Sequence, residues 1–145
     1  MLILSYNVRG LGGDSKLTTL CRILDLNKPK VVAFQETMSG GGKSKEVLKG
    51  VLKDWQRETL AAEGHLGGMI TSSSPDIFFH NKATFKDVIG IELEDPKIGL
   101  HFYLLNVYAP FYDRRSYWET LSKSGALVHD NLILVGDLNL TLTTG

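Results

Sequence analysis

The sequence predicts a mixed α/β or α+β fold, in which helices cover the outer faces of β-sheets. Apolar runs long enough for buried strands alternate with segments of helical periodicity near both ends of the chain. Between them, strand patterns follow one another closely, separated by clusters of Gly, Ser, Pro and Asn. This order of elements favours a sandwich of sheets with helices outside it.

The first third of the chain predicts a strand, a helix and a second strand. Residues 1–6 and 31–35 are short apolar runs that suit buried strands. Residues 15–26 carry leucine and isoleucine near helical spacing, and Pro29 lies just beyond them. The other expected elements are a turn at 9–13, a glycine loop at 39–43 and a second helix at 44–52.

The remaining elements are mostly strands, spaced closely enough for an antiparallel meander. The expected strands are 55–61, 68–72, 76–80, 84–94 and 100–107. Asp113 is placed to cap a third helix that runs to Ser124. Its inner face is expected to carry Tyr117, Trp118 and Leu121. A last strand, residues 132–135, leads into Gly136-Asp-Leu-Asn139.

Composition suits one globular domain, since 43% of the 145 residues are hydrophobic and 22% are charged. The formal net charge of zero argues against a free-standing nucleic-acid binder, but not against an enzyme that holds one phosphodiester with a metal. No apolar run approaches the roughly 20 residues of a membrane span, and the N-terminus is unlike a signal peptide. With a single cysteine, the sequence favours an intracellular protein of the nucleus or cytoplasm, not a secreted one, and indicates no obligate protein partner.

Polar residues directly follow several of the apolar runs: Asn7, Glu36, Tyr108, Asp137 and Asn139. Because the ends of buried strands converge on one edge of a sheet, we expect these side chains to meet there. Two carboxylates with nearby amides suit a hard cation such as Mg²⁺. Each acid on its own could equally end a strand and face solvent.

Four segments resemble, in order, the motifs of the endonuclease/exonuclease/phosphatase family. They are Leu4-Ser-Tyr-Asn-Val-Arg-Gly-Leu11, Pro29-Lys-Val-Val-Ala-Phe-Gln-Glu-Thr37, Asn106-Val-Tyr-Ala-Pro110 followed by Arg114, Arg115, Tyr117 and Trp118, and Leu134-Val-Gly-Asp-Leu-Asn139. The Asn-x-Arg-Gly-Leu opening is typical of members from non-LTR (LINE-type) retrotransposons, especially those of plants. The resemblance implies a partial four-layer α/β/β/α sandwich with its C-terminal half missing, so that residues 1–145 form one truncated domain.

For function, the resemblance implies metal-dependent hydrolysis of a phosphodiester, with DNA as the partner. Glu36 would be the main ligand of Mg²⁺, or of Mn²⁺ in its place, with Asn7 supporting it. Asp137 would orient or deprotonate the attacking water. Asn139 would hold the phosphate and the Asp137 side chain, and Tyr108 would donate to a phosphate oxygen. Further candidates for phosphate contacts are Arg9 and Arg114, with Lys16 and Arg115.

The sequence also departs from the family. Phe111 stands where the family commonly has Asn after Tyr-x-Pro, and Leu138 replaces the usual Phe. The family supplies an Asp and an Asp-His pair from its C-terminal half, and no Ser-Asp-His occurs in this sequence. Three of the four histidines, His65, His80 and His101, are interpreted as surface or strand residues. A weak or inactive nuclease is therefore expected, since losing a positioned acid or base costs about 10²–10⁴ in rate.

Two alternatives stay open. Ser39-Gly-Gly-Gly-Lys-Ser44 follows a strand as a nucleotide-binding P-loop would, but Thr37 stands where that motif needs glycine. The chain could also be a non-catalytic retroelement-derived fragment or an interaction module that retains the motifs of its ancestry.

Overall fold

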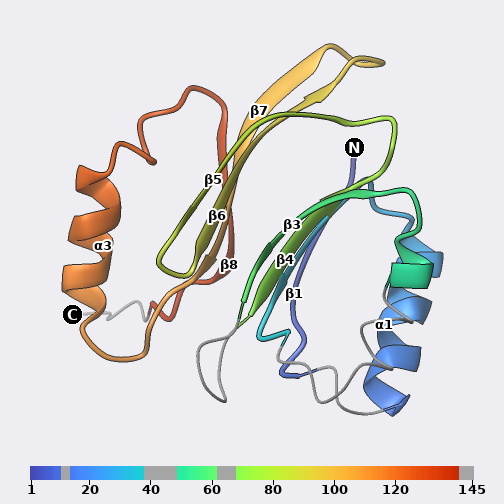
Figure 1. Cartoon of the computed structure of the whole chain (residues 1–145), viewed down its shortest axis with the longest axis horizontal. Coiled ribbons are helices and arrows are strands. Elements are labelled where there is room, and N and C mark those ends of the chain that lie inside the picture. The colour runs from blue at the N-terminus through green and yellow to red at the C-terminus, as the bar shows by residue number, and fades with distance from the viewer. Residues whose placement is uncertain (11–13, 38–48, 62–67, 141–145) are drawn as a thin grey trace, which may run out of the picture.

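Two four-stranded sheets pack face to face at the centre of the molecule, and a helix lies on the outer side of each (Figure 1). The computed structural model describes residues 1–10, 14–37, 49–61 and 68–140. The layers follow the order helix, sheet, sheet, helix, which confirms the expected mixed α/β sandwich.

The first sheet has the strand order β1-β2-β4-β3. Strands β1 (Ile3–Asn7) and β2 (Val31–Gln35) run parallel, and helix α1 (Asp14–Asn27) connects them. Strand β4 (Met69–Ser73) is antiparallel to β2 and to β3 (Gln56–Leu60). The parallel pair brings the carboxyl ends of β1 and β2 side by side at one edge of the sheet.

The second sheet has the order β5-β6-β7-β8. Strands β5 (Phe78–Phe85), β6 (Val88–Asp95) and β7 (Leu100–Tyr108) form an antiparallel meander. Strands β3 and β4 were expected in the same meander but pair in the first sheet. Helix α3 (Arg114–Lys123) then connects β7 to the parallel strand β8 (Leu132–Asp137). Each sheet therefore contains one parallel pair joined by a helix, with polar residues at its carboxyl ends.

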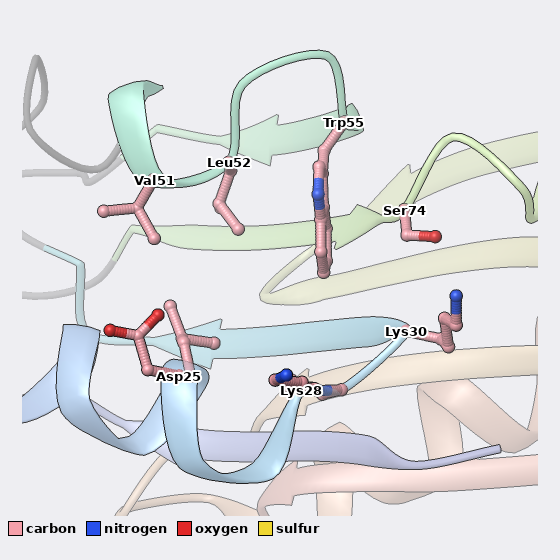
Figure 2. Close-up of a pocket in the computed structure, with 9 residues that line it drawn as sticks. Asp25, Lys28, Lys30, Val51, Leu52, Trp55 and Ser74 are labelled. Carbon is pink, nitrogen blue, oxygen red and sulfur yellow. The ribbon is translucent and has the colours of Figure 1, made fainter.

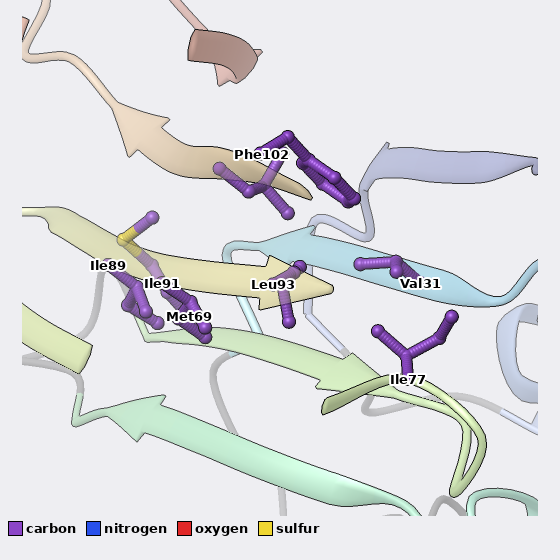
Figure 3. Close-up of a cluster of buried hydrophobic side chains, with 8 residues drawn as sticks. Val31, Met69, Ile77, Ile89, Ile91, Leu93 and Phe102 are labelled. Atoms are coloured by element: carbon purple, nitrogen blue, oxygen red, sulfur yellow. The ribbon is translucent and has the colours of Figure 1, made fainter. Parts of the chain in front are cut away.

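Strand alternation divides the apolar residues among three cores. On β2, Val32 and Phe34 pack with helix α1, whereas Val31 faces the second sheet. Strand β7 alternates in the same way, since Leu105 packs with helix α3 and Leu104 faces the first sheet. The buried core between the sheets, shown in Figure 3, consists of Val31, Met69, Ile77, Ile89, Ile91, Leu93, Phe102 and Leu104.

Two expectations about local structure were wrong. The single strand expected at 84–94 is two strands, because the chain reverses at Lys86-Asp87 between β5 and β6. Asp87 takes the left-handed conformation (φ 55°) that tight hairpins use, without the glycine that usually marks such a turn. Asp113 precedes helix α3 as expected, but its φ is 54° and its side chain makes no capping hydrogen bond.

The glycine loop expected at 39–43 lies outside the described residues, as does most of the helix expected at 44–52, of which residues 49–51 are helical. The P-loop alternative falls on this loop and stays a prediction. Among the helices that the structure describes, none is long and apolar enough to cross a membrane.

Candidate active site

The polar residues predicted to converge do lie together, at the edge where the parallel strands of both sheets end. Asn7 ends β1 and Glu36 follows β2, while Tyr108 and Asp137 are register partners at the ends of β7 and β8. All four side chains are half-buried, as is Asn139. The cluster thus takes two members from each sheet and spans the interface between the sheets.

Asp137 is fixed through both of its carboxylate oxygens. Oδ2 accepts a hydrogen bond from Nδ2 of Asn7 at 3.1 Å, across the two sheets. Oδ1 accepts one from the backbone N–H of Asn139 at 3.2 Å. The backbone N–H of Arg9 in turn donates to Oδ1 of Asn7 at 3.0 Å, which sets the orientation of that amide. Asp137 is therefore held as a rigid acceptor, which suits a group that must orient a water molecule.

Tyr108 and Glu36 form the second contact between the sheets. The pKa of Tyr108 is raised to about 12, mainly by burial and in addition by the negative charge of Glu36 and its hydrogen bond with the phenol. The charge of Asp137 acts in the same direction, so both carboxylates lie near the hydroxyl. The phenol therefore stays protonated at neutral pH and remains a hydrogen-bond donor.

Three residues of this edge have a left-handed backbone: Arg9 (φ 49°), Glu36 (φ 52°) and Asn139 (φ 45°). This conformation is uncommon for residues other than glycine and costs free energy, so the surrounding structure must hold it in place. At Glu36, the carbonyl accepts a hydrogen bond from the N–H of Gly10 at 2.7 Å. The strand therefore stops sharply at Gln35, and the next side chain is turned into the cluster.

Gly136 allows β8 to approach β7 closely beside the site. Its φ is 124°, and a Cβ at this position would lie 1.9 Å from the carbonyl oxygen of Val107 and 2.8 Å from its nitrogen. No side chain fits there without displacing the backbone. The glycine before Asp137 is thus required by the packing of the two strands, and sequence reasoning gave it no role.

Two buried amides join the sheets beside the cluster by a hydrogen bond. The sequence did not predict this role. Gln35 is 1% exposed and Asn106 is fully buried, both on the inner faces of their sheets. Nε2 of Gln35 donates to Oδ1 of Asn106 at 2.8 Å, and Nδ2 of Asn106 donates to the hydroxyl of Thr71 at 3.1 Å. We refer to Gln35 and Asn106 as the amide bridge. It joins the sheets one residue before Glu36 and two residues before Tyr108.

The two arginines predicted to contact phosphate differ in how far they are buried. Arg9 is exposed, two residues beyond Asn7. Arg114 is half-buried, and its Nη1 donates to the carbonyl oxygen of Asn139 at 2.7 Å. The side-chain amide of Asn139 donates to the carbonyl of Ala109 at 2.5 Å, so Asn139 holds the carboxylate of Asp137 through its backbone N–H and not through its side chain. The side-chain amide that contacts this carboxylate is that of Asn7.

The donor set fits a hard divalent cation. Among the described residues, no group of three or more His, Cys, Asp or Glu side chains is arranged to hold a metal. Mg²⁺ does not need such a group, because it commonly keeps several waters and binds through one or two carboxylates and a substrate phosphate. Glu36, with Asn7 and Asp137 nearby, offers only oxygen ligands of this kind.

One pocket and two histidine–glutamate pairs lie away from the candidate active site. The pocket in Figure 2 is lined by residues that include Lys30, Trp55 and Ser74, at the end of the first sheet opposite Glu36. His80 and His101 are exposed on β5 and β7, where they pair with Glu94 and Glu92 at 2.6 and 2.7 Å. Their expected position on surface strands is confirmed, whereas His65 lies outside the described residues.

Comparisons with known proteins bear on the fold. No protein-family model and no curated protein matches this sequence. TDP2 from D. rerio, solved with a single-strand DNA product, matches with a TM-score of 0.72 at 20% identity, over 96% of this chain and 60% of that one. An endonuclease/exonuclease/phosphatase family protein from Bacteroides thetaiotaomicron matches at 0.68 and 12% identity, over 94% and 61%. The human Nocturnin catalytic domain, solved with a sulfate anion, matches at 0.66 and 12% identity, over 96% and 64%.

These matches show that the chain has the fold of endonuclease/exonuclease/phosphatase proteins, as its motifs predicted. The chain spans 60 to 64% of the length of these three structures. The narrower assignment to a retrotransposon nuclease, and the roles of the individual site residues, stay predictions.

Proposed function

We propose that this chain carries the site of a metal-dependent phosphodiester hydrolase. The observation that carries the proposal is the meeting of Asn7 and Glu36 from one sheet with Tyr108 and Asp137 from the other, joined by hydrogen bonds between the sheets. Two carboxylates, an amide and a protonated phenol within one half-buried cluster match what the hydrolysis of a phosphodiester requires.

In this proposal Glu36 holds Mg²⁺, or Mn²⁺ in its place, with Asn7 beside it. The bound cation supplies neutralisation of the negative charge on the phosphoryl group. Asp137, fixed through both oxygens, orients the attacking water and accepts its proton. Tyr108 donates from its phenol to a phosphate oxygen after exchanging its hydrogen bond with Glu36. Asn139 reaches the phosphate in the same way, after releasing the carbonyl of Ala109.

DNA is the substrate that we favour within this class. The Asn7-Val-Arg-Gly-Leu11 opening supports a nicking endonuclease of the retroelement type, and one structure with this fold was solved with a single-strand DNA product. Two arginines, Arg9 and Arg114, lie at the edge of the site and could contact backbone phosphates. We expect slow turnover from the 145-residue chain, because the Asp-His pair of the family has no counterpart in this sequence.

The test is Mg²⁺-dependent nicking of supercoiled plasmid by the purified chain and by a Glu36→Ala, Asp137→Ala double variant. We expect the parent to nick and the double variant to lose at least about 100-fold in rate. A matched control removes two exposed acids from the outer helices, Asp25→Ala and Glu119→Ala, and should nick like the parent.

Circular dichroism of all three proteins establishes that each is folded before their rates are compared. Equal rates for the folded parent and the folded double variant would reject the hydrolase. In that case the motifs record ancestry, and the non-catalytic alternative holds.

A further inference from the structure

Two neighbouring aromatic side chains are exposed next to the candidate site. Phe111 is 68% exposed and Tyr112 is 80% exposed, in the segment between β7 and α3. Their rings meet edge to face with centroids 5.3 Å apart. Large aromatic side chains that face solvent together are costly to hydrate, so an adjacent exposed pair marks a surface for binding.

The pair is tied to the site through Arg114. The guanidinium carbon lies 5.9 Å from the centroid of the Phe111 ring, and Nη1 of the same group donates to the carbonyl oxygen of Asn139 at 2.7 Å. One side chain thus reaches both Phe111 and Asn139, which lies two residues after Asp137. Along the chain, Phe111 is three residues after Tyr108, so phosphate-binding and aromatic groups follow one another on the same segment.

We propose that Phe111 and Tyr112 form a stacking platform for a nucleobase of a single-stranded or locally unpaired nucleic acid whose phosphate lies in the site. The inference rests on the proposed hydrolase function and names its substrate class. Every base has a flat π-face, so aromatic rings bind single strands without reading their sequence. The positive charge of Arg114 beside Phe111 adds attraction for the phosphate backbone and contributes a cation–π contact.

The same aromatic surface favours a nucleic acid over a sugar phosphate or inositol phosphate as the main substrate. Those ligands present hydroxyl groups and several phosphates, which are matched by polar and basic side chains. Among the described residues next to the site, Phe111 and Tyr112 add exposed aromatic surface to the exposed cation Arg9, and Arg114 is shared between one ring and a backbone carbonyl. The phenylalanine also stands where the resembled family commonly has Asn, so the change adds apolar stacking surface beside the site.

The test measures binding in EDTA, so that no hydrolysis occurs. Two fluorescent oligonucleotides of about 10 nucleotides, within the usual range of site sizes, are titrated and followed by anisotropy. One carries normal bases and the other is abasic throughout, with the same charge. We expect Phe111→Ala with Tyr112→Ala to weaken binding of the base-bearing strand by about 5- to 100-fold. Binding of the abasic strand should change less than twofold.

A conservative variant and a matched control complete the design. Phe111→Trp with Tyr112→Phe should retain binding, because both side chains still present a ring. Phe78→Ala with Phe85→Ala removes two exposed aromatics from β5 and should leave binding unchanged. Equal losses for both strands, no loss in the alanine variant, or failure of the folded parent to bind the base-bearing strand would overturn the inference. The nicking assay decides the hydrolase separately, because it depends on Glu36 and Asp137 and not on base stacking.

Discussion

At the scale of single residues, Gly136 is a position where the backbone leaves no room for a side chain. Its positive φ disfavours any side chain, and a Cβ would overlap the backbone of Val107. We expect Gly136→Ala to lower the free energy of unfolding by roughly 2–5 kcal/mol, since β8 must move away from β7. Urea denaturation measures the change.

Two other glycines allow the effect of a positive φ to be separated from the effect of steric overlap. Gly99 has a φ of 64° but open space around its Cβ position, so Gly99→Ala should cost only about 1–2 kcal/mol. Gly50 has neither constraint and lies in the helical residues 49–51, so Gly50→Ala should be neutral or stabilising by up to about 1 kcal/mol. If alanine lowered the free energy of unfolding equally at Gly136 and Gly99, β8 would be able to move away from Val107 without a loss of stability.

The ionisation of Tyr108 gives a second prediction at this scale. Its pKa is raised to about 12 in the folded protein against 10.0 for the free side chain. At a pH between these two pKa values, the unfolded chain binds fewer protons than the folded one. The free energy of unfolding therefore falls as pH rises from about 10 to 12. A tyrosinate absorbance titration of the parent minus that of Tyr108→Phe should have its midpoint near pH 12. A midpoint near 10 would mean that neither burial nor Glu36 acts on the phenol.

At the scale of elements, the amide bridge fixes how the two sheets meet. Asn106→Leu leaves the buried Nε2 of Gln35 without its acceptor in Asn106, which should cost about 1–3 kcal/mol in the free energy of unfolding. Adding Gln35→Leu should recover part of this cost, because no buried amide then lacks its partner. The two variants and their combination form a double-mutant cycle with an expected coupling of about 1 kcal/mol or more.

Asn81→Leu is the control for the amide bridge, since its amide is exposed on β5 and donates a hydrogen bond to Glu92 within the second sheet. Its effect should stay within about 0.5 kcal/mol. Additive losses in the cycle would show that Gln35 and Asn106 stabilise their own strands rather than the contact between the sheets.

The elements also show how far sequence reasoning reached. Buried strands such as β2 and the helix α1 were predictable because apolar periodicity and Pro29 are local signals. The turn at Lys86-Asp87 was not, since its left-handed Asp87 is held by strand pairing on both sides. The convergence of the site residues followed from strand ends alone. Their partners did not, because the bond between Asn7 and Asp137 joins residues 130 positions apart.

A polar signal was nevertheless present for the amide bridge. Asn106 interrupts the apolar run Leu104-Leu105-Asn106-Val107, and a polar residue within a buried strand must find a partner. The identity of that partner depends on how the sheets pack, which only the folded chain defines.

At the scale of the whole molecule, the site is built across an interface, so a ligand that binds it should stabilise both sheets at once. Glu36 belongs to the first sheet and Asp137 to the second, and both carboxylates lie near Tyr108. A cation placed there would offset their mutual repulsion and bind the folded state alone. At a concentration 100 times its dissociation constant, it stabilises the fold by about 2.7 kcal/mol, or roughly 5–10 °C in Tm.

This final prediction does not depend on catalysis. Mn²⁺ or Mg²⁺ should raise the Tm of the chain in one cooperative transition, measured by calorimetry, and Glu36→Gln should abolish the rise. Glu119→Gln changes an exposed acid on α3 and should keep it. A rise that persists in Glu36→Gln would place the cation elsewhere in the molecule. A rise confined to one of two separate transitions would show that the sheets unfold independently, and that the hydrogen bond between Asn7 and Asp137 does not couple them.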